Sequence, residues 1–279
     1  MLYGRESKKL ILVITPIKHI KGVKDQLKKA GELLIFEDAN LPDIKKHIKN
    51  IDAIFTNPNK SNIFIGKDII SLSEKLKVIC TASTGTIHID SNYAKKRGIE
   101  IISLTEERKH INKITSTAEL AFAIMMSSLR HVNQSYNSVL EGHWDYVPYI
   151  GKQLNCLNVG VIGYGRLGRL FCQYTKAFDS KIFVYDPYVI VKERSYKQMD
   201  NLSELISKCD VISIHVHVNK ETSGMINSDL LAFAKKDVLI VNTSRGEIIN
   251  EHDIIEFLIS NEKARLATDV ISNEISDKA

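Results

Sequence analysis

Three regularly spaced glycines lie at a point where the chain can bind an anion. In "NVGVIGYGRLGRLF", Gly163, Gly165 and Gly168 follow a short apolar run and precede a helical pattern. In this G-x-G-x-x-G spacing the first glycine permits a tight turn, the second lets the backbone approach a pyrophosphate, and the third lets helix and strand pack closely. Amides at the start of the helix then face the anion. Alone the pattern is weak, because glycine turns also join strands to helices for steric reasons.

An acidic residue strengthens this interpretation. Asp186 ends the next apolar run, "KIFVYD", eighteen residues after Gly168. A carboxylate at this place accepts hydrogen bonds from ribose hydroxyls and repels a 2′-phosphate. A simple strand-ending turn at Asp186 and Pro187 is the alternative. Because strand, turn, helix, strand and acid are in register, the sequence predicts dinucleotide binding, with NAD favoured over NADP.

An arginine follows another apolar run. Arg245, in "DVLIVNTSRGEIINEHDI", stands just past the expected carboxyl end of a strand, which is where open parallel sheets bind ligands. Its guanidinium is always charged and can hold a carboxylate by two parallel bonds. On this residue alone, a surface arginine in a polar turn is an equal alternative.

Cysteine spacing argues against a metal centre. Cys80, Cys156, Cys172 and Cys209 lie far apart and form no CxxC motif, so neither a zinc site nor a disulfide framework is predicted. We expect buried or idle thiols and no bound metal.

The elements that must position these residues come in two series. Short runs rich in Val and Ile alternate with helical patterns, which indicates βαβ units and parallel sheets. A long helical pattern, 115–144, lies between the series; Ser116 and Glu119 have capping-box spacing. We expect the following strands: 10–15, 33–38, 53–58, 77–83 and 100–104, then 158–163, 181–186, 210–216, 238–243 and 265–270. The expected apolar stripe of the connecting helix is Leu120, Ile124, Met125, Leu129 and Val132.

Composition limits the class of protein. The 279 residues are 44% hydrophobic and 25% charged with a net charge of +5, as in ordinary globular proteins. No run of about 18 apolar residues predicts a membrane span, and the N-terminus does not resemble a secretion signal. The lysines are spread over amphipathic stretches, typical of solvated helix faces, although a preference for anionic small molecules stays open. We expect a cytoplasmic protein that binds neither membrane nor nucleic acid.

Taken together, the motifs resemble the D-isomer-specific 2-hydroxyacid dehydrogenase family. They are "VGVIGYGRLGR", "VYDP", "VISIHV", "VNTSRGEIINEHDI" and "ATDV" followed by Glu274, with "STGTIHIDSNYAKKRGIEI" and "STAELAFAIMM" upstream. The similarity spans nearly the whole chain and is specific to the family, not to one member. It implies an α/β fold of two doubly wound parallel-sheet domains. Residues 1–103 would form a flavodoxin-like substrate domain, and 104–279 an interdomain helix and a Rossmann NAD-binding domain.

The resemblance also implies a function. The family interconverts a D-2-hydroxy acid and its 2-keto acid with NAD, so the expected partners are NAD, a small 2-keto or 2-hydroxy acid, and a second copy in a homodimer. Arg245 matches the arginine that binds the substrate carboxylate and carbonyl, and Glu274 matches the catalytic glutamate. The backbone of Ser83, Thr84 and Gly85 matches a loop that holds the carboxylate. Expected cofactor contacts, besides the three glycines and Asp186, are Arg166, Leu167, Val216, His217, Thr243, Ser244 and Asp269.

Two stretches depart from the family pattern. In "HVHVN", His217 stands where many members have proline, at a strand end that meets the cofactor. A local hydrogen-bonding role is the favoured interpretation of His215 and His217, with catalysis as the minor alternative. The segment "LTEERKHINKITS" is long and basic, and it either shapes substrate entry or is a solvated loop.

The end of the sequence raises a further expectation. In the family, a histidine after the glutamate donates the proton, and the glutamate raises the pKa of that imidazole. Only five residues follow Glu274 and none is histidine. We therefore expect impaired activity and leave two alternatives open. One is a truncated ordinary dehydrogenase; the other is a catalytically inactive NAD-binding regulatory or scaffold protein. The sequence does not specify which 2-hydroxy acid would react.

Overall fold

A computed structural model describes residues 8–38, 40–58, 63–105 and 107–272. The described chain forms two compact units, one up to Lys113 and one from Ile114 onward, and each is considered by itself. Within these ranges no helix has the length and apolar character needed to cross a membrane. The domain limits expected at 1–103 and 104–279 stay predictions, because compactness alone does not define a substrate domain.

The first unit contains a five-stranded parallel sheet. Its strand order, β2-β1-β3-β4-β5, is the flavodoxin-like order predicted from the sequence. The alternating side chains of these strands point to two faces, and each face has its own apolar core. The strands are β1 Leu10–Val13, β2 Glu32–Ile35, β3 Ala53–Thr56, β4 Val78–Thr81 and β5 Glu100–Ile102.

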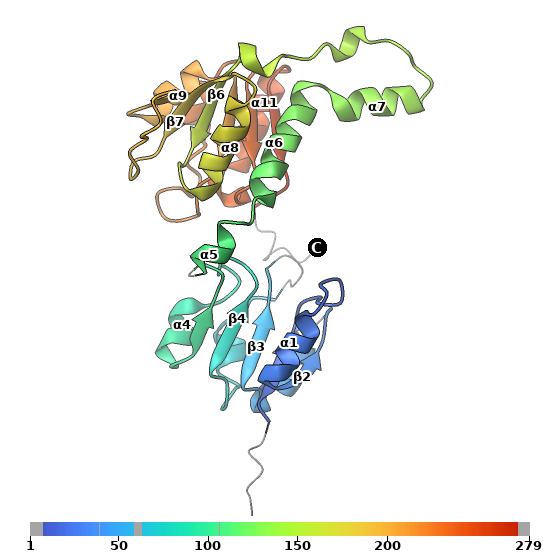
Figure 1. The fold of residues 1–279 in the computed structure, drawn as a ribbon, viewed down its shortest axis with the longest axis vertical. Helices are drawn as coiled ribbons and strands as arrows, with labels where there is room; N and C mark the ends of the chain where they lie inside the picture. Colours follow the sequence, from blue (N-terminus) through green and yellow to red (C-terminus); the bar gives the residue numbers. More distant parts are fainter. Residues whose placement is uncertain (1–7, 39, 59–62, 106, 273–279) are drawn as a thin grey trace, which may run out of the picture. The chain divides into compact units, whose positions relative to one another are not determined.

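Short helices cover both faces of this sheet, as Figure 1 shows for α1 and α4. Helix α1 supplies Val23 and Leu27 to one core. Helices α2, α3 and α4 supply Ile44, Ile69, Ile70 and Ala94 to the other. The helices are α1 Val23–Ala30, α2 Leu41–His47, α3 Lys67–Ile70, α4 Ser91–Lys96 and α5 Arg108–Ile111, with a 3-10 turn η1 Ile48–Asn50.

The second unit contains a six-stranded parallel sheet. Its order is β11-β10-β9-β6-β7-β8, so the first strand of the unit, β6, lies at the centre where the order reverses. This is the Rossmann arrangement, and it confirms the predicted fold class. The strands are β6 Asn158–Ile162, β7 Lys181–Tyr185, β8 Tyr196–Gln198, β9 Val211–Ile214, β10 Leu239–Asn242 and β11 Arg265–Thr268.

Helices pack on both faces of the second sheet. On one face α6 and α8 lie side by side (Figure 1) over a core that includes Met125, Val161 and Phe171. On the other face α9, α10 and α11 cover a core that includes Leu205, Ile212 and Ile254. The helices are α6 Ser116–Leu129, α7 Val132–Leu140, α8 Arg166–Lys176, α9 Leu202–Lys208, α10 Ser228–Leu231 and α11 Glu251–Ser260; 3-10 turns are η2 Val147–Tyr149, η3 Leu154–Cys156 and η4 Gly246–Ile248.

The connecting helix differs from its prediction in three ways. Thr115, not Ser116, is the N-cap residue of α6, and its hydroxyl donates to the Glu119 carboxylate. The pattern 115–144 is also not one helix, because His131 has a positive φ of 54° and α7 starts after it. The buried stripe is Ala118, Ala121, Met125 and Leu129, whereas Leu120 and Val132 of the expected stripe are exposed. Small alanines let α6 approach the sheet closely, so they replace larger residues on its inner face.

All ten expected strands form, each shorter than expected, and an eleventh strand was not predicted. The extra strand, β8, has three residues, pairs with β7 alone and lies at the sheet edge. Its residues Tyr196, Lys197 and Gln198 lack an apolar run, which is the signal that identifies buried parallel strands.

Candidate functional site

The glycine turn connects β6 to α8 at the point where the strand order reverses. Gly163 has a positive φ of 91°, and a Cβ there would lie 2.6 Å from the carbonyl oxygen of His215. A Cβ on Gly168 would lie 2.0 Å from the carbonyl oxygen of Gly163. No atom of the described residues lies within 4 Å of a Cβ built on Gly165. Two glycines are therefore required by close packing, while the third borders open space.

Unpartnered backbone amides border this space. The first hydrogen bond of α8 runs from the Arg169 amide to the Gly165 carbonyl, at 3.1 Å. The amides of Gly165 to Gly168 precede it and donate to no described residue. Such amides carry the partial positive charge of a helix start, which favours an anion. The Arg166 guanidinium donates a hydrogen bond to the Ile114 carbonyl, and burial lowers the pKa of this side chain. Leu167, the next residue, is half-buried.

Asp186 ties the glycine turn to the loop after β7. One carboxylate oxygen accepts the Tyr164 amide at 2.7 Å. The other accepts the amides of Tyr188 at 2.9 Å and Val189 at 3.0 Å. A carboxylate has roughly four acceptor sites, so about one remains for a ligand hydroxyl. The side chain is thus both a structural anchor and a candidate ribose acceptor.

A glutamine outside the predicted set holds the same loop. Gln198, on the edge strand β8, donates from Nε2 to the Val189 carbonyl at 2.9 Å and accepts the Val191 amide at Oε1, also at 2.9 Å. These bonds fix the segment that begins with Asp186. No sequence signal marks Gln198, because it lies on a polar strand that the hydrophobic pattern does not reveal.

The turn after β10 is organised by Asn242, a residue not assigned a role from the sequence. Asn242 is 1% exposed. It accepts the Ser244 amide at 3.0 Å and donates to the Arg245 carbonyl at 2.9 Å. The Ser244 hydroxyl donates to the Ile214 carbonyl at 2.7 Å, which joins the turn to β9. Arg245 is half-buried, and its Nη1 donates to the Ser244 carbonyl at 2.6 Å. A buried amide at the end of an apolar run was the available signal for Asn242.

The remaining predicted cofactor residues of the second unit lie at strand ends. Val216 packs against Gly163, and the carbonyl of exposed His217 accepts the Thr222 hydroxyl at 2.5 Å. The Thr243 hydroxyl is buried and has no partner in the described part of the chain. Asp269 is exposed directly after β11. Glu274 lies outside the described residues.

In the first unit, all three carbonyls of the predicted substrate loop accept hydrogen bonds. The Leu104 amide donates to the Ser83 carbonyl at 3.0 Å, and the Thr105 hydroxyl donates to the Thr84 carbonyl at 2.8 Å. The Ser83 hydroxyl donates to the Gly85 carbonyl at 2.7 Å. The amides of Ser83, Thr84 and Gly85 donate to no described residue. The loop therefore offers donors without acceptors, and the start of the basic segment "LTEERKHINKITS" helps to hold it.

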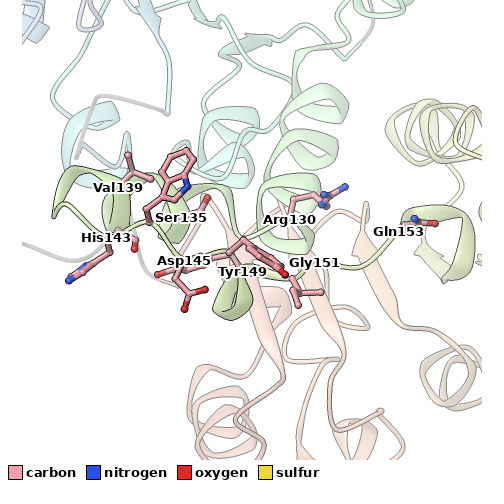
Figure 2. A pocket seen from close by; sticks show the side chains of 12 residues that line it. Arg130, Ser135, Val139, His143, Asp145, Tyr149, Gly151 and Gln153 are labelled. Atoms are coloured by element: carbon pink, nitrogen blue, oxygen red, sulfur yellow. The ribbon is translucent and has the colours of Figure 1, made fainter.

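Two hollows lie on the second unit, one away from the glycine turn and one beside it. One of about 620 Å³ is bordered by α7 and the chain that follows it; Figure 2 shows Val139, His143, Asp145 and Tyr149 around it. None of its lining residues belongs to the predicted site. Another, of about 390 Å³, is lined by Tyr164 and Arg169 with Ile190, Lys192 and Glu193. Arg169 lies over the Tyr164 ring at 4.8 Å, so its cation is already engaged beside the glycine turn.

His215 lies behind the glycine turn. Its Nε2 is 2.9 Å from the Ser213 hydroxyl, its Nδ1 is covered and has no described partner, and its ring centroid is 5.0 Å from that of Phe171. Burial lowers the pKa of His215 to about 4. The neutral ring fits the local hydrogen-bonding role predicted for it.

Comparisons with known proteins agree with this geometry. The family model described as D-isomer specific 2-hydroxyacid dehydrogenase, NAD binding domain, matches residues 122–279, and the catalytic-domain model of the same family matches residues 11–143. A hydroxypyruvate reductase of Thermotoga maritima is 30% identical over 258 residues, which cover 90% of this chain and 82% of that protein. A crystal structure of D-lactate dehydrogenase from Aquifex aeolicus, complexed with NAD and lactic acid, has a TM-score of 0.81 and 26% identity, covering 95% of this chain and 78% of that one.

Other relatives are much longer. The D-3-phosphoglycerate dehydrogenase of Methanocaldococcus jannaschii is 30% identical over 95% of this chain, and that of Bacillus subtilis is 31% identical over 84%. The chain spans only 49% and 44% of these two proteins, about half of their length.

We predict that His215 makes stability depend on pH. Its folded-state pKa is about 4, against 6.5 for an ordinary histidine, so the unfolded chain takes up the proton first. The free energy of unfolding should be highest above pH 6.5 and fall as the pH drops toward 4. At about 1.4 kcal/mol per pKa unit, the loss is roughly 3 kcal/mol. Urea unfolding at pH 7, 5.5 and 4.5 should show a shallower loss for His215→Gln, which retains a bond to Ser213. His252→Gln, at an exposed site, is the control; an unchanged slope in His215→Gln would contradict the prediction.

Proposed function

The chain belongs to the D-isomer-specific 2-hydroxyacid dehydrogenase family, and we propose that it interconverts a D-2-hydroxy acid and its 2-keto acid with NAD. One observation carries the proposal. Four amides, from Gly165 to Gly168, lie at the carboxyl end of β6 without an acceptor among the described residues, and Asp186 is fixed beside them by the Tyr164 amide. This combination supplies donors for a pyrophosphate and an acceptor for a ribose hydroxyl.

The residues of the second unit fit the dinucleotide. Open space at Gly165 leaves room for a phosphate against the backbone, and the buried Thr243 hydroxyl has an unused hydrogen-bonding capacity among the described residues. The Gly165 to Gly168 amides would hold the pyrophosphate and Asp186 a ribose hydroxyl, with Val216, His217, Thr243, Ser244 and Asp269 as the further proposed contacts. When bound, NAD takes up or supplies the hydride. The Asp186 charge would disfavour a 2′-phosphate.

Arg245 is the proposed substrate anchor. Hydride transfer to a 2-keto acid develops negative charge on the carbonyl oxygen, and a cation beside that oxygen stabilises it. The Ser244 carbonyl occupies one guanidinium nitrogen of Arg245, which leaves other donors for a carboxylate or carbonyl. In the first unit, the amides of Ser83, Thr84 and Gly85, which donate to no described residue, are the proposed carboxylate-binding donors. This arrangement favours small anionic substrates over neutral ones.

We also propose a cytoplasmic location. All four cysteines are free, and burial raises the pKa of both the Cys172 and Cys209 thiols to about 12. Unpaired thiols of this kind are usual in a reducing compartment.

A homodimer is proposed from the surface around α7. Helix α7 and the segment after it extend from the second unit (Figure 1), and they expose several large apolar side chains next to one another in the sequence, a feature of protein–protein interaction sites. Arg130 and Asp145 line the hollow beside these residues, and opposite charges on one surface can pair with those of a second copy across a two-fold axis. The exposed apolar residues are Tyr136 64%, Val139 51%, Leu140 69%, Trp144 91%, Tyr146 78%, Val147 59% and Ile150 65%.

Charge placed on this patch should separate the dimer. Leu140→Glu is expected to convert the sedimenting species to a monomer, because a carboxylate would be buried without a partner. Ile259→Glu, at a position on α11 that is 75% exposed, should leave the dimer intact. A wild-type chain that sediments as a monomer at micromolar concentration would refute the homodimer.

NADH should bind at least about tenfold more tightly than NADPH, because Asp186 repels the extra phosphate. Gly165→Val should abolish binding of both while leaving the free energy of unfolding close to that of the wild type, since its Cβ enters open space. Gly168→Ala should instead lower that free energy, because its Cβ would stand 2.0 Å from the Gly163 carbonyl oxygen. Fluorescence titration with both cofactors and urea unfolding measure these effects. Equal or tighter NADPH binding would exclude the proposed role of Asp186.

Arg245→Ala should weaken binding of a 2-keto acid to the NADH complex by at least about 2 kcal/mol, the cost of losing a charge-assisted bidentate contact. Arg245→Lys should weaken keto-acid binding by an intermediate amount, because lysine keeps the positive charge but cannot form the two parallel hydrogen bonds of a guanidinium. NADH affinity should stay at the wild-type value in both. Glyoxylate, pyruvate and hydroxypyruvate are suitable substrates for NADH-oxidation and binding assays. Unchanged keto-acid binding in Arg245→Ala would remove the anchor role, and NADH binding without turnover of any keto acid would favour the regulatory alternative.

A further inference from the structure

A buried histidine lies behind the loop of Ser83, Thr84 and Gly85. His88 is 0% exposed and Thr81, the last residue of β4, is 2% exposed. The His88 Nε2 is 3.1 Å from the Thr81 hydroxyl, and this hydroxyl is 2.8 Å from that of Ser83. The Ser83 hydroxyl reaches the Gly85 carbonyl at 2.7 Å. Three side chains therefore connect the core of the first unit to the carbonyl of a half-exposed glycine.

The number of hydrogens determines the direction of this chain. Each hydroxyl has one hydrogen to donate. The Ser83 hydrogen goes to the Gly85 carbonyl, so Ser83 must accept the hydrogen of Thr81. Thr81 then has none left for the histidine and must accept from it. The His88 Nε2 therefore carries a hydrogen, and every bond in the chain points toward the loop.

The inner end of this series of hydrogen bonds is held by regular backbone pairing. The His88 carbonyl accepts the Ile65 amide at 2.8 Å, and the neighbouring Ile89 forms a parallel bridge with Ile65. Thr81 is held in β4 by its pairing with β3. The loop, by contrast, is half-exposed and lies in no helix or strand. The core therefore fixes the position of the loop through the hydroxyls of Thr81 and Ser83.

We propose that His88 is a positioning residue for the substrate loop. By engaging the Gly85 carbonyl, the directed hydrogen bonds of His88, Thr81 and Ser83 would hold the loop so that the amides of Ser83, Thr84 and Gly85, which donate to no described residue, can receive a carboxylate. This proposal rests on the proposed function, because the amides that His88 would position are those proposed to bind the substrate. His88 touches neither substrate nor cofactor and acts only through its hydrogen bonds.

Matched variants test the chain. Thr81→Val removes the central hydroxyl at nearly constant volume, and Thr81→Ser retains it. Thr56→Val is the control, because Thr56 pairs with Thr81 across β3 and β4, is 0% exposed, and has a hydroxyl without a described partner. The ligand is oxamate, an unreactive 2-keto acid analogue, titrated into the NADH complex of the whole chain. NADH affinity reports that the second unit remains folded.

Thr81→Val should weaken oxamate binding about five- to tenfold, the effect of losing one or two neutral hydrogen bonds that order the loop. Thr81→Ser and Thr56→Val should stay within about twofold of the wild type, and all variants should bind NADH normally. His88→Gln, which retains a donor, should bind oxamate better than His88→Leu. Oxamate affinity that is unchanged in Thr81→Val would overturn the proposal, and so would an equal loss in Thr56→Val.

Nuclear magnetic resonance separates this proposal from the proposed function. The ¹⁵N shifts of His88 should show hydrogen on Nε2, and the Gly85 amide resonance should move in Thr81→Val but not in Thr81→Ser. If the wild type binds NADH but no oxamate, the proposed substrate class is wrong, and the Gly85 resonance still tests the chain. A His88 ring without hydrogen on Nε2, or a Gly85 resonance that is unaffected by Thr81→Val, would refute it.

Discussion

The close approach of Gly168 to the Gly163 carbonyl is the constraint on which the second unit depends. The space there excludes even a methyl group, so α8 can begin only at this distance from β6. As a result, the first amides of α8 lie at the carboxyl end of β6, and the Tyr164 amide reaches Asp186. The Gly163 turn also packs against the carbonyl of His215, the residue directly after β9. One steric requirement thus joins three neighbouring strands at the proposed cofactor site.

The two units expose backbone donors by different means. In the second unit, helix geometry does it, because the first four amides of any α-helix lack an intrahelical acceptor. The loop after β4 in the first unit has no helix to orient it. Its carbonyls are instead each occupied by a donor from Leu104, Thr105 or Ser83. A loop of this kind depends on side-chain hydrogen bonds, and its precision is therefore more sensitive to single substitutions.

Fold class could be predicted from the sequence because Val- and Ile-rich runs report burial on both faces of a sheet. The steric functions of Gly163 and Gly168 in the turn were also predictable, whereas the pyrophosphate contact at Gly165 stays a prediction. Gln198 and Asn242 were not predicted. Their importance comes from hydrogen bonds to backbone atoms that only the tertiary fold brings near, and polar edge strands such as β8 give no hydrophobic signal. The apolar stripe of α6 was mispredicted because it also depends on the tertiary fold. Close packing against the sheet selects small alanines for the inner face of the helix, and hydrophobic periodicity does not detect this requirement.

Trp144 has a practical consequence. It is the only tryptophan in the chain, it lies in the segment after α7, and it is 91% exposed. Indole emission is red-shifted in water and moves to the blue when the ring is buried. Tryptophan fluorescence from this protein thus originates at the α7 surface, so a shift of that emission on dilution would report association of chains and would be largely separate from ligand binding near Gly165. Trp144 is thus an intrinsic fluorescent probe with which association of chains can be tested.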